Sequence, residues 1–291
     1  MYLFDNKTLK WEDGDGNRYC MHVHQDEIPD DPRENCEPLT TMACWHRRRN
    51  LGDDIGNLEP DVFWQKLVED NVPEEFITAA AIAGEIGSIS VSANADDPKL
   101  YDIRIDGELH EENMGVPESY IPRYILNDLS IQDFQKLLHP YAEWLPIWGY
   151  EHGGIAISCG VRVYPFSDVW DSGQLGVIIA LKDRILSEFP LDPNDDDTWR
   201  KKADEIMQTD VKEYNQYLTG EVYWIQIFKF VDDGTEDGGW DEIDGCSGFY
   251  GDDPVENGIV DAAGYGLKEA LESGTVEEGT AQQHTTVTWV Y

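Results

Sequence analysis

The stretch YEHGGIAISCGVRVYPFSDVWDSGQLGVIIALKDRI, residues 150–185, is a long segment in which apolar residues dominate an otherwise acidic chain. Two runs rich in strand-forming residues, 155–164 and 175–181, flank the turn-forming residues 165–173. This pattern predicts a central hairpin or a pair of strands, because Pro, Gly, Ser and Asp favour turns between runs of strand formers. We therefore expect this stretch to supply the core of the fold.

Helical and strand patterns follow one another without a regular order in the rest of the chain. The spacing of apolar residues predicts helices at 61–69, from 73 onward, and at 130–138, 183–189, 198–218 and 255–273. Strands are predicted at 18–24, 86–91, 100–105, 221–231 and 285–291, with 221–231 buried on both faces and 232–244 a loop.

These elements predict an α+β fold, in which helices pack on a mixed or antiparallel sheet. The sequence has no GxGxxG or P-loop pattern of a nucleotide-binding βαβ unit. No low-complexity linker divides the 291 residues, so we expect a single domain, 1–291.

The composition is strongly acidic, with 59 Asp and Glu against 21 Lys and Arg and a formal net charge of −38. Such a surface repels phosphate backbones, so we expect no direct binding to DNA or RNA. Two explanations of the acidity stay open. A halophilic host selects acidic surfaces, because concentrated salt screens their repulsion. Alternatively, the carboxylates imitate nucleic acid and occupy the basic groove of a DNA-binding protein.

Five cysteines, an odd number at irregular spacing and without a CxxC pair, predict reduced thiols inside a cell. The first residues lack the basic and apolar regions of a secretory signal. No apolar segment approaches the roughly 18 residues that span a bilayer. We therefore expect an intracellular protein with no membrane partner.

Two groups of residues could bind a divalent cation, the one cofactor class that the sequence suggests. Cys20, His22 and His24 share one face of the predicted strand 18–24, and a His-x-His pair can chelate a transition metal. The alternative is the polar face of an edge strand. Asp237, Asp241 and Asp244 in the predicted loop could hold Ca²⁺, or could form a solvated acidic loop.

His46, Arg47, Arg48 and Arg49 form a basic cluster in this acidic chain. Arginine forks bind phosphate or carboxylate bidentately, so the cluster could be an anion site. With Asp53 a few residues on, the arginines could instead form internal ion pairs that hold this segment to the core.

The hypothesis of a catalytic function depends on His152, which follows a glutamate and precedes two glycines. As a general base it could activate Ser158, Cys159 or Ser172 as the nucleophile, with Asp171 as the acid, which would make the protein a hydrolase. The sequence has no GxSxG elbow, and a hydrogen-bonded histidine at the start of a strand is the alternative.

Five motifs run through the chain: DPRE at 31–34, CWHRRRNLGD at 44–53, WDSGQLG at 170–176, YLTGEVY at 217–223 and GFYG at 248–251. In these motifs and their order the chain resembles an uncharacterised family of proteins encoded by phages and prophages. The resemblance implies a viral origin and a location in the host cytoplasm.

From the acidity and that resemblance, we expect a viral accessory protein that acts by binding a host protein. Its target would be a nucleic-acid-binding protein, and its effect the inhibition of a host defence by DNA mimicry. The alternatives are a hydrolase that uses His152 or a metal bound at His22 and His24, and a virion structural protein.

Overall fold

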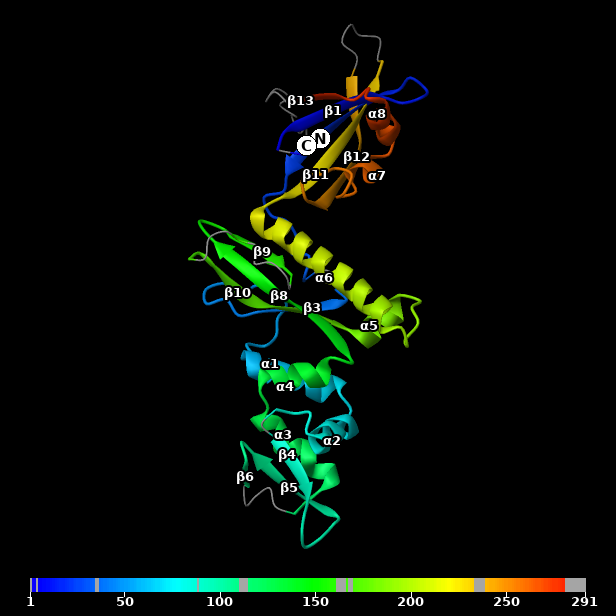
Figure 1. Cartoon of the computed structure of the whole chain (residues 1–291). Helices are drawn as coiled ribbons and strands as arrows, with labels where there is room; N and C mark the ends of the chain where they lie inside the picture. The colour runs from blue at the N-terminus through cyan, green and yellow to red at the C-terminus, as the bar shows by residue number, and fades with distance from the viewer. Residues whose placement is uncertain are drawn as a thin grey trace, which may run out of the picture. The chain divides into compact units, whose positions relative to one another are not determined.

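A computed structural model describes residues 2–3, 5–34, 37–87, 89–109, 115–160, 166, 170–232 and 239–280 of the chain. These residues fall into two compact units, each with its own apolar core (Figure 1). Unit 1 comprises Met1–Glu37, Tyr150–Ser158 and Asp210–Tyr291, and unit 2 comprises Pro38–Gly149 and Cys159–Thr209.

The sequence predicts a single domain because no linker marks the border between the units. Three of the four borders between the units instead lie inside regular elements: strand β8 (Ala142–Glu151), strand β9 (Ile155–Cys159) and helix α6 (Asp196–Thr219). The fourth border, between Glu37 and Pro38, lies outside helices and strands.

Unit 1 is built on a five-stranded antiparallel sheet, which we call sheet 1, with the strand order β12-β11-β2-β1-β13. Its strands are β1 (Lys7–Glu12), β2 (Arg18–Gln25), β11 (Val222–Val231), β12 (Gly239–Tyr250) and β13 (Glu277–Thr280). In the turn between β1 and β2, the Asp13 carboxylate accepts hydrogen bonds from the N–H groups of Asp15 and Asn17. An Asp carboxylate that accepts backbone N–H groups in this way stabilises a tight turn.

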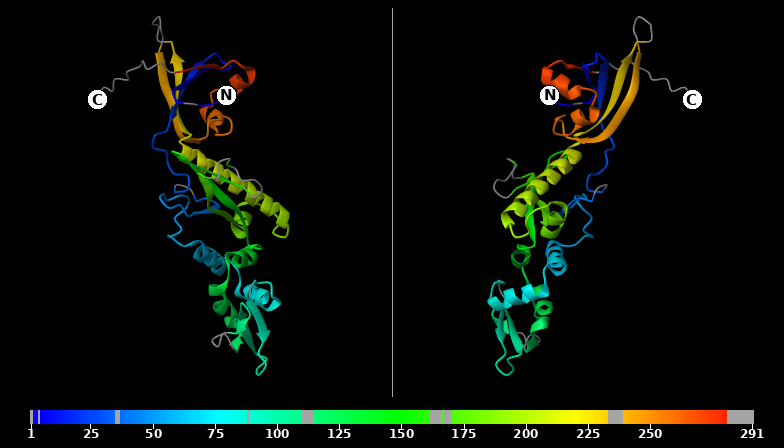
Figure 2. Two further views of the ribbon diagram at one scale, coloured as in Figure 1. Left: turned by 60° about the vertical axis from the view of Figure 1, so that its left-hand side comes forward. Right: turned by 90° about the vertical axis from the view of Figure 1, so that its right-hand side faces the viewer.

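Two short helices, α7 (Ile259–Ala263) and α8 (Leu267–Ser273), cover one face of sheet 1 (Figure 2). Between sheet and helices lies the core of unit 1, which includes Leu9, Met21, Val23, Ile225, Ile227, Ile259 and Leu267. The single helix predicted at 255–273 is wrong, because the backbone turns left-handed at Gly258, Gly264 and Gly266. Glycine adopts that conformation readily, and it interrupts the helical hydrogen bonds.

Unit 2 contains β3 (Thr40–Cys44) and β10 (Ser172–Leu181) in a sheet of order β3-β10-β8-β9. β9 and β10 are not neighbours in this sheet, so the predicted hairpin between 155–164 and 175–181 is wrong. β8 lies between them. Its sequence is AEWLPIWGYE, whose aromatic residues and isoleucine favour a strand.

The rest of unit 2 packs helices and a small antiparallel sheet on the second core. Helices α1 (Pro60–Asn71) and α4 (Ile131–Leu138) lie side by side (Figure 1). The other elements are α2 (Glu74–Ala83), β4 (Ile89–Ala93), β5 (Leu100–Ile105), β6 (Glu108–Leu109), β7 (Val116–Pro117), α3 (Ile121–Ile125) and α5 (Lys182–Glu188), with 3-10 turns at Glu118–Tyr120 and Leu126–Asp128.

Local signals predicted several elements correctly. Ser130 caps α4 in a capping box, in which its hydroxyl accepts the Asp133 N–H while the Asp133 carboxylate accepts the Ser130 N–H. Helices and antiparallel sheets together confirm the α+β class. Among the described residues, no helix has the length and apolar character needed to cross a membrane.

Candidate binding face on sheet 1

Sheet 1 has a second face, whose side chains point away from α7 and α8 because neighbouring residues in a strand alternate between faces. We call it the open face, since no helix covers it in the described part of unit 1 (Figure 2). The strand registers place on it Thr8, Lys10, Arg18, Cys20, His22, His24, Trp224, Gln226, Phe228, Phe230, Trp240 and Glu242.

Partly exposed rings stand next to one another across three strands of the open face. His24 stacks on Trp224 with ring centroids 4.2 Å apart, and the His22 ring lies 5.0 Å from that of Phe228. On the same face, Phe230 meets Trp240 edge-on at 5.4 Å. Cross-strand aromatic pairs stabilise a sheet by about 0.2–1 kcal/mol each, far less than full burial of such rings would give.

The Arg18 guanidinium lies over the Phe230 ring, 3.6 Å from its centroid. Arg18 and Lys10 bring positive charge to the open face, and negative charge comes from Glu242 and from Glu12, which pairs with Arg18 across the strands. The charges on the face are therefore nearly balanced, in contrast to the rest of unit 1. The 59 Asp and Glu and 21 Lys and Arg of the chain divide as 29 and 7 in unit 1 and 30 and 14 in unit 2.

Two buried polar atoms of the open face lack a hydrogen-bond partner among the described residues: Thr8 Oγ1 and His24 Nε2. Thr8 is only 6% exposed. A buried hydroxyl or ring nitrogen without a partner costs about 1–3 kcal/mol, so these two atoms lower the stability of the folded sheet.

Exposed carboxylates line the two edges of sheet 1. Asp241 and Asp244 lie on the edge strand β12, and Glu277 and Glu278 lie on the opposite edge strand β13. Aromatic rings in the middle and charged groups at the border are the arrangement typical of protein-binding surfaces.

The metal site predicted at Cys20, His22 and His24 has the expected common face, but its residues do not form a ligand cluster. Among the described residues, no three His, Cys, Asp or Glu side chains come close enough to hold a metal ion. Burial raises the pKa of Cys20 to about 11, so its thiol keeps its proton at neutral pH. Burial, and then the charges of His24 and Lys10, lower the pKa of His22.

The acidic loop predicted at 232–244 is wrong in its second half, because β12 begins at Gly239. Asp241 pairs with Lys229, and Asp244 with Ile227, across the strands, and a register shift follows Ile227. A β-bulge lets a strand accommodate an extra residue. The glycines and aspartates of this segment are typical of loops, so the sequence pattern did not predict the strand. Asp237 lies outside the described residues.

The basic cluster follows β3 in unit 2, and its arginines are exposed. His46 Nδ1 accepts the N–H groups of Arg48 and Arg49 at 3.2 and 3.1 Å, which stabilises the turn. Asp53 accepts the Met42 N–H at 2.9 Å and returns its own N–H to the Met42 carbonyl at 2.8 Å, so it closes the loop back onto β3. Arg47 is exposed like Arg48 and Arg49.

Gly52 is required in this loop because its backbone is left-handed, with φ +71°. A Cβ at this position would meet the Met42 carbonyl oxygen.

The hydrolase candidates do not belong to one compact unit. His152 is exposed in the turn between β8 and β9, with its ring stacked on Tyr150, and belongs to unit 1. Asp171 and Ser172 belong to unit 2, where Ser172 begins β10.

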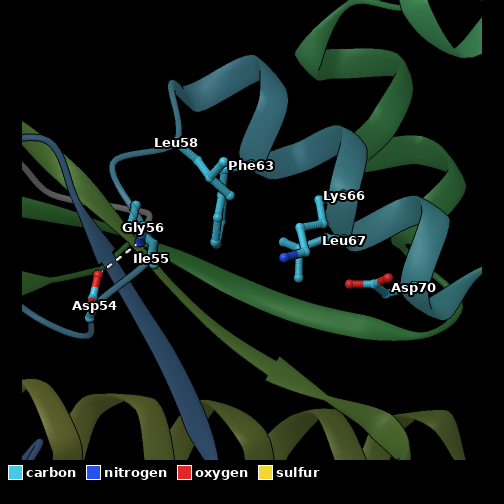
Figure 3. Close-up of a pocket in the computed structure, with 8 residues that line it drawn as sticks. All are labelled: Asp54, Ile55, Gly56, Leu58, Phe63, Lys66, Leu67 and Asp70. Carbon is cyan, nitrogen blue, oxygen red and sulfur yellow. Dashed lines mark hydrogen bonds between the residues drawn. The ribbon is translucent and has the colours of Figure 1, made fainter.

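A shallow pocket of about 390 Å³ lies between the loop before α1 and α1 itself (Figure 3). Asp54 at one end accepts the N–H of Gly56, while Lys66 and Asp70 stand at the other end. Between them are the apolar side chains of Ile55, Leu58, Phe63 and Leu67. The polar groups do not converge on one point, so this pocket is a weaker candidate than the open face.

Sequence reasoning identified Cys20, His22 and His24 on the open face but missed its aromatic residues. Trp224, Phe228 and Phe230 alternate with core residues along β11, and we predicted both sets to be buried. The burial of β11 alternates instead, with Ile225 and Ile227 inside. The alternation of polar and apolar residues in the neighbouring strand β2 could have indicated that one face of the sheet is exposed.

Comparisons of this chain with protein-family models, curated proteins and solved structures found no match. The resemblance to phage- and prophage-encoded proteins therefore stays a prediction from the motifs.

Proposed function

We propose that this chain is a viral accessory protein that docks a basic host protein on the open face of sheet 1. The array of partly exposed rings on that face carries the proposal. Aromatic residues supply most of the energy in many protein interfaces, and here they lie on rigid strands.

The charge around the open face selects the kind of partner. Unit 1 carries 29 Asp and Glu against 7 Lys and Arg, and four of these carboxylates line the edges of sheet 1. Such a field repels polyanions and attracts a basic surface, whose encounter with the protein it accelerates. A host protein whose own ligand is nucleic acid fits this requirement, which makes the acidic rim a DNA mimic.

Pull-down from host lysate compares the wild-type chain with the double variant Trp224→Ala, Phe228→Ala. Loss of two interface rings should weaken capture of the specific partner more than tenfold. Tyr124→Ala, which removes a partly exposed ring in unit 2, is the matched control and should capture the partner normally. Circular dichroism checks that all three proteins are folded.

Duplex DNA is then titrated into the purified complex at constant salt concentration. If the acidic rim imitates DNA, the two ligands exclude one another. A ternary complex of partner, DNA and this chain would show that the protein is not a mimic, and capture by the double variant at wild-type strength would show that the open face is not the docking site.

A further inference from the structure

Unit 2 contains a groove of about 560 Å³ bordered by residues of α1, α4, β8 and β10. We call it the tryptophan groove after Trp45, Trp64 and Trp144, which line it. Its other lining residues include three glutamines and two prolines, and none of them carries a charge. In a unit with 30 Asp and Glu and 14 Lys and Arg, a lining without charge favours a neutral ligand.

The rings of the tryptophan groove are held in fixed positions. Trp64 meets Trp144 edge-on, with centroids 5.5 Å apart and planes at 77°, and Phe63 packs against both Trp45 and Trp64. The indole N–H of Trp45 donates to the Leu58 carbonyl at 2.8 Å. Edge-on rings leave a notch between them, and a rigid notch binds without a large loss of side-chain entropy.

Hydrogen-bond donors are left over in this groove. Within the described part of the chain, the indole N–H groups of Trp64 and Trp144 have no protein acceptor, and neither is among the buried polar atoms without a partner, so both are accessible to a ligand. The amides of Gln132 and Gln135, one turn apart on α4, have no hydrogen-bond partner there either. An indole is a donor only, so the groove calls for a ligand rich in acceptors.

We propose that the tryptophan groove binds a proline-rich segment of another protein in the polyproline II conformation. Proline has no N–H, and in this conformation the backbone carbonyls point outward without internal partners. They are the acceptors that the indole and glutamine donors lack, while the proline rings fit between aromatic side chains. A saccharide is the competing ligand, because the glutamine amide oxygens can accept hydrogen bonds from its hydroxyl groups, and the test therefore includes one.

This site is independent of the proposed function, since it lies in unit 2 and takes a neutral ligand. The test titrates the full chain with a fluorescein-labelled decaproline peptide and follows fluorescence anisotropy. Saturable binding with Kd below about 1 mM is expected, which is an ordinary strength for a short peptide. Trp144→Ala should weaken it at least tenfold, and Trp224→Ala on the open face should leave it unchanged.

Gln135→Leu provides a second variant, because the side chain is only partly buried and its loss leaves the rings in place. It should weaken peptide binding about three- to tenfold, the effect of one lost hydrogen bond. No saturable binding of decaproline at 1 mM would overturn the proposal. So would equal binding by the wild-type chain and both groove variants, or a preference for neutral maltohexaose over the peptide.

Discussion

The two faces of sheet 1 use large apolar side chains in opposite ways. On the face toward α7 and α8, Ile225 and Ile227 are almost completely buried. On the open face, Trp224 and Phe228 come from the same strand and stay partly exposed. Rings that add little to the stability of the monomer are available for a partner, so the contrast separates residues that fold the protein from residues that we propose bind.

Ile227→Ala tests the folding side of this comparison, with its neighbour Phe228→Ala as the matched control. Ile227 is 1% exposed, so the truncation leaves a cavity and should lower the free energy of unfolding by about 2–5 kcal/mol. Phe228→Ala removes a ring that is already partly hydrated and should cost about 1 kcal/mol or less. Urea denaturation measures both, and equal losses would mean that the open face is covered in solution.

A second comparison sets the buried Arg33 against the exposed Arg48 and concerns their contributions to stability. Arg33 is 8% exposed and forms an ion pair with Asp210 at 3.1 Å, near Glu213, whose pKa is raised by burial and by Asp210. Arg33→Met keeps the apolar stem but leaves both carboxylates without this counter-charge. The free energy of unfolding should fall by about 2 kcal/mol, which is less than for a fully buried ion pair because Asp210 is partly exposed.

Arg48→Ala is the control, because Arg48 is an exposed residue of the basic cluster. Its effect on the free energy of unfolding should stay within about 0.5 kcal/mol. The same urea series measures both variants. A loss of stability at Arg48 as large as at Arg33 would instead support the internal ion pairs considered for the basic cluster.

The sequence predicts what local interactions determine. The strand predicted at 100–105 matches β5, and the helix predicted at 130–138 matches α4 together with its cap Ser130, because strand propensity and helix capping depend on nearby residues. The common face of Cys20, His22 and His24 follows from the alternation of a strand.

Which strands are neighbours, and which face of a sheet is covered by helices, depend on segments far apart in the sequence. These features were not predicted from the sequence. Nothing in residues 155–181 shows that β8 separates β9 from β10. The exposure of Trp224 and Phe228 depends on α7 and α8, which lie on one side of the sheet only. The same sequence in a sheet covered on both sides would be an ordinary buried strand.

The smallest expected effect concerns the pH dependence of stability, through His22 on the open face. Burial, followed by the charges of His24 and Lys10, lowers the pKa of His22, so the folded protein favours its neutral ring. On acidification below pH 6.5 the unfolded chain takes up this proton first, and stability falls as the pH approaches the lowered pKa of the folded state. His22→Gln should therefore lose less stability than the wild type between pH 7 and pH 5 in urea denaturation. His152→Gln, which changes a histidine in an exposed turn, is the control. Its free energy of unfolding should depend on pH as that of the wild type does. If His22→Gln and the wild type lose the same free energy of unfolding between pH 7 and pH 5, the ring of His22 is hydrated in the folded protein.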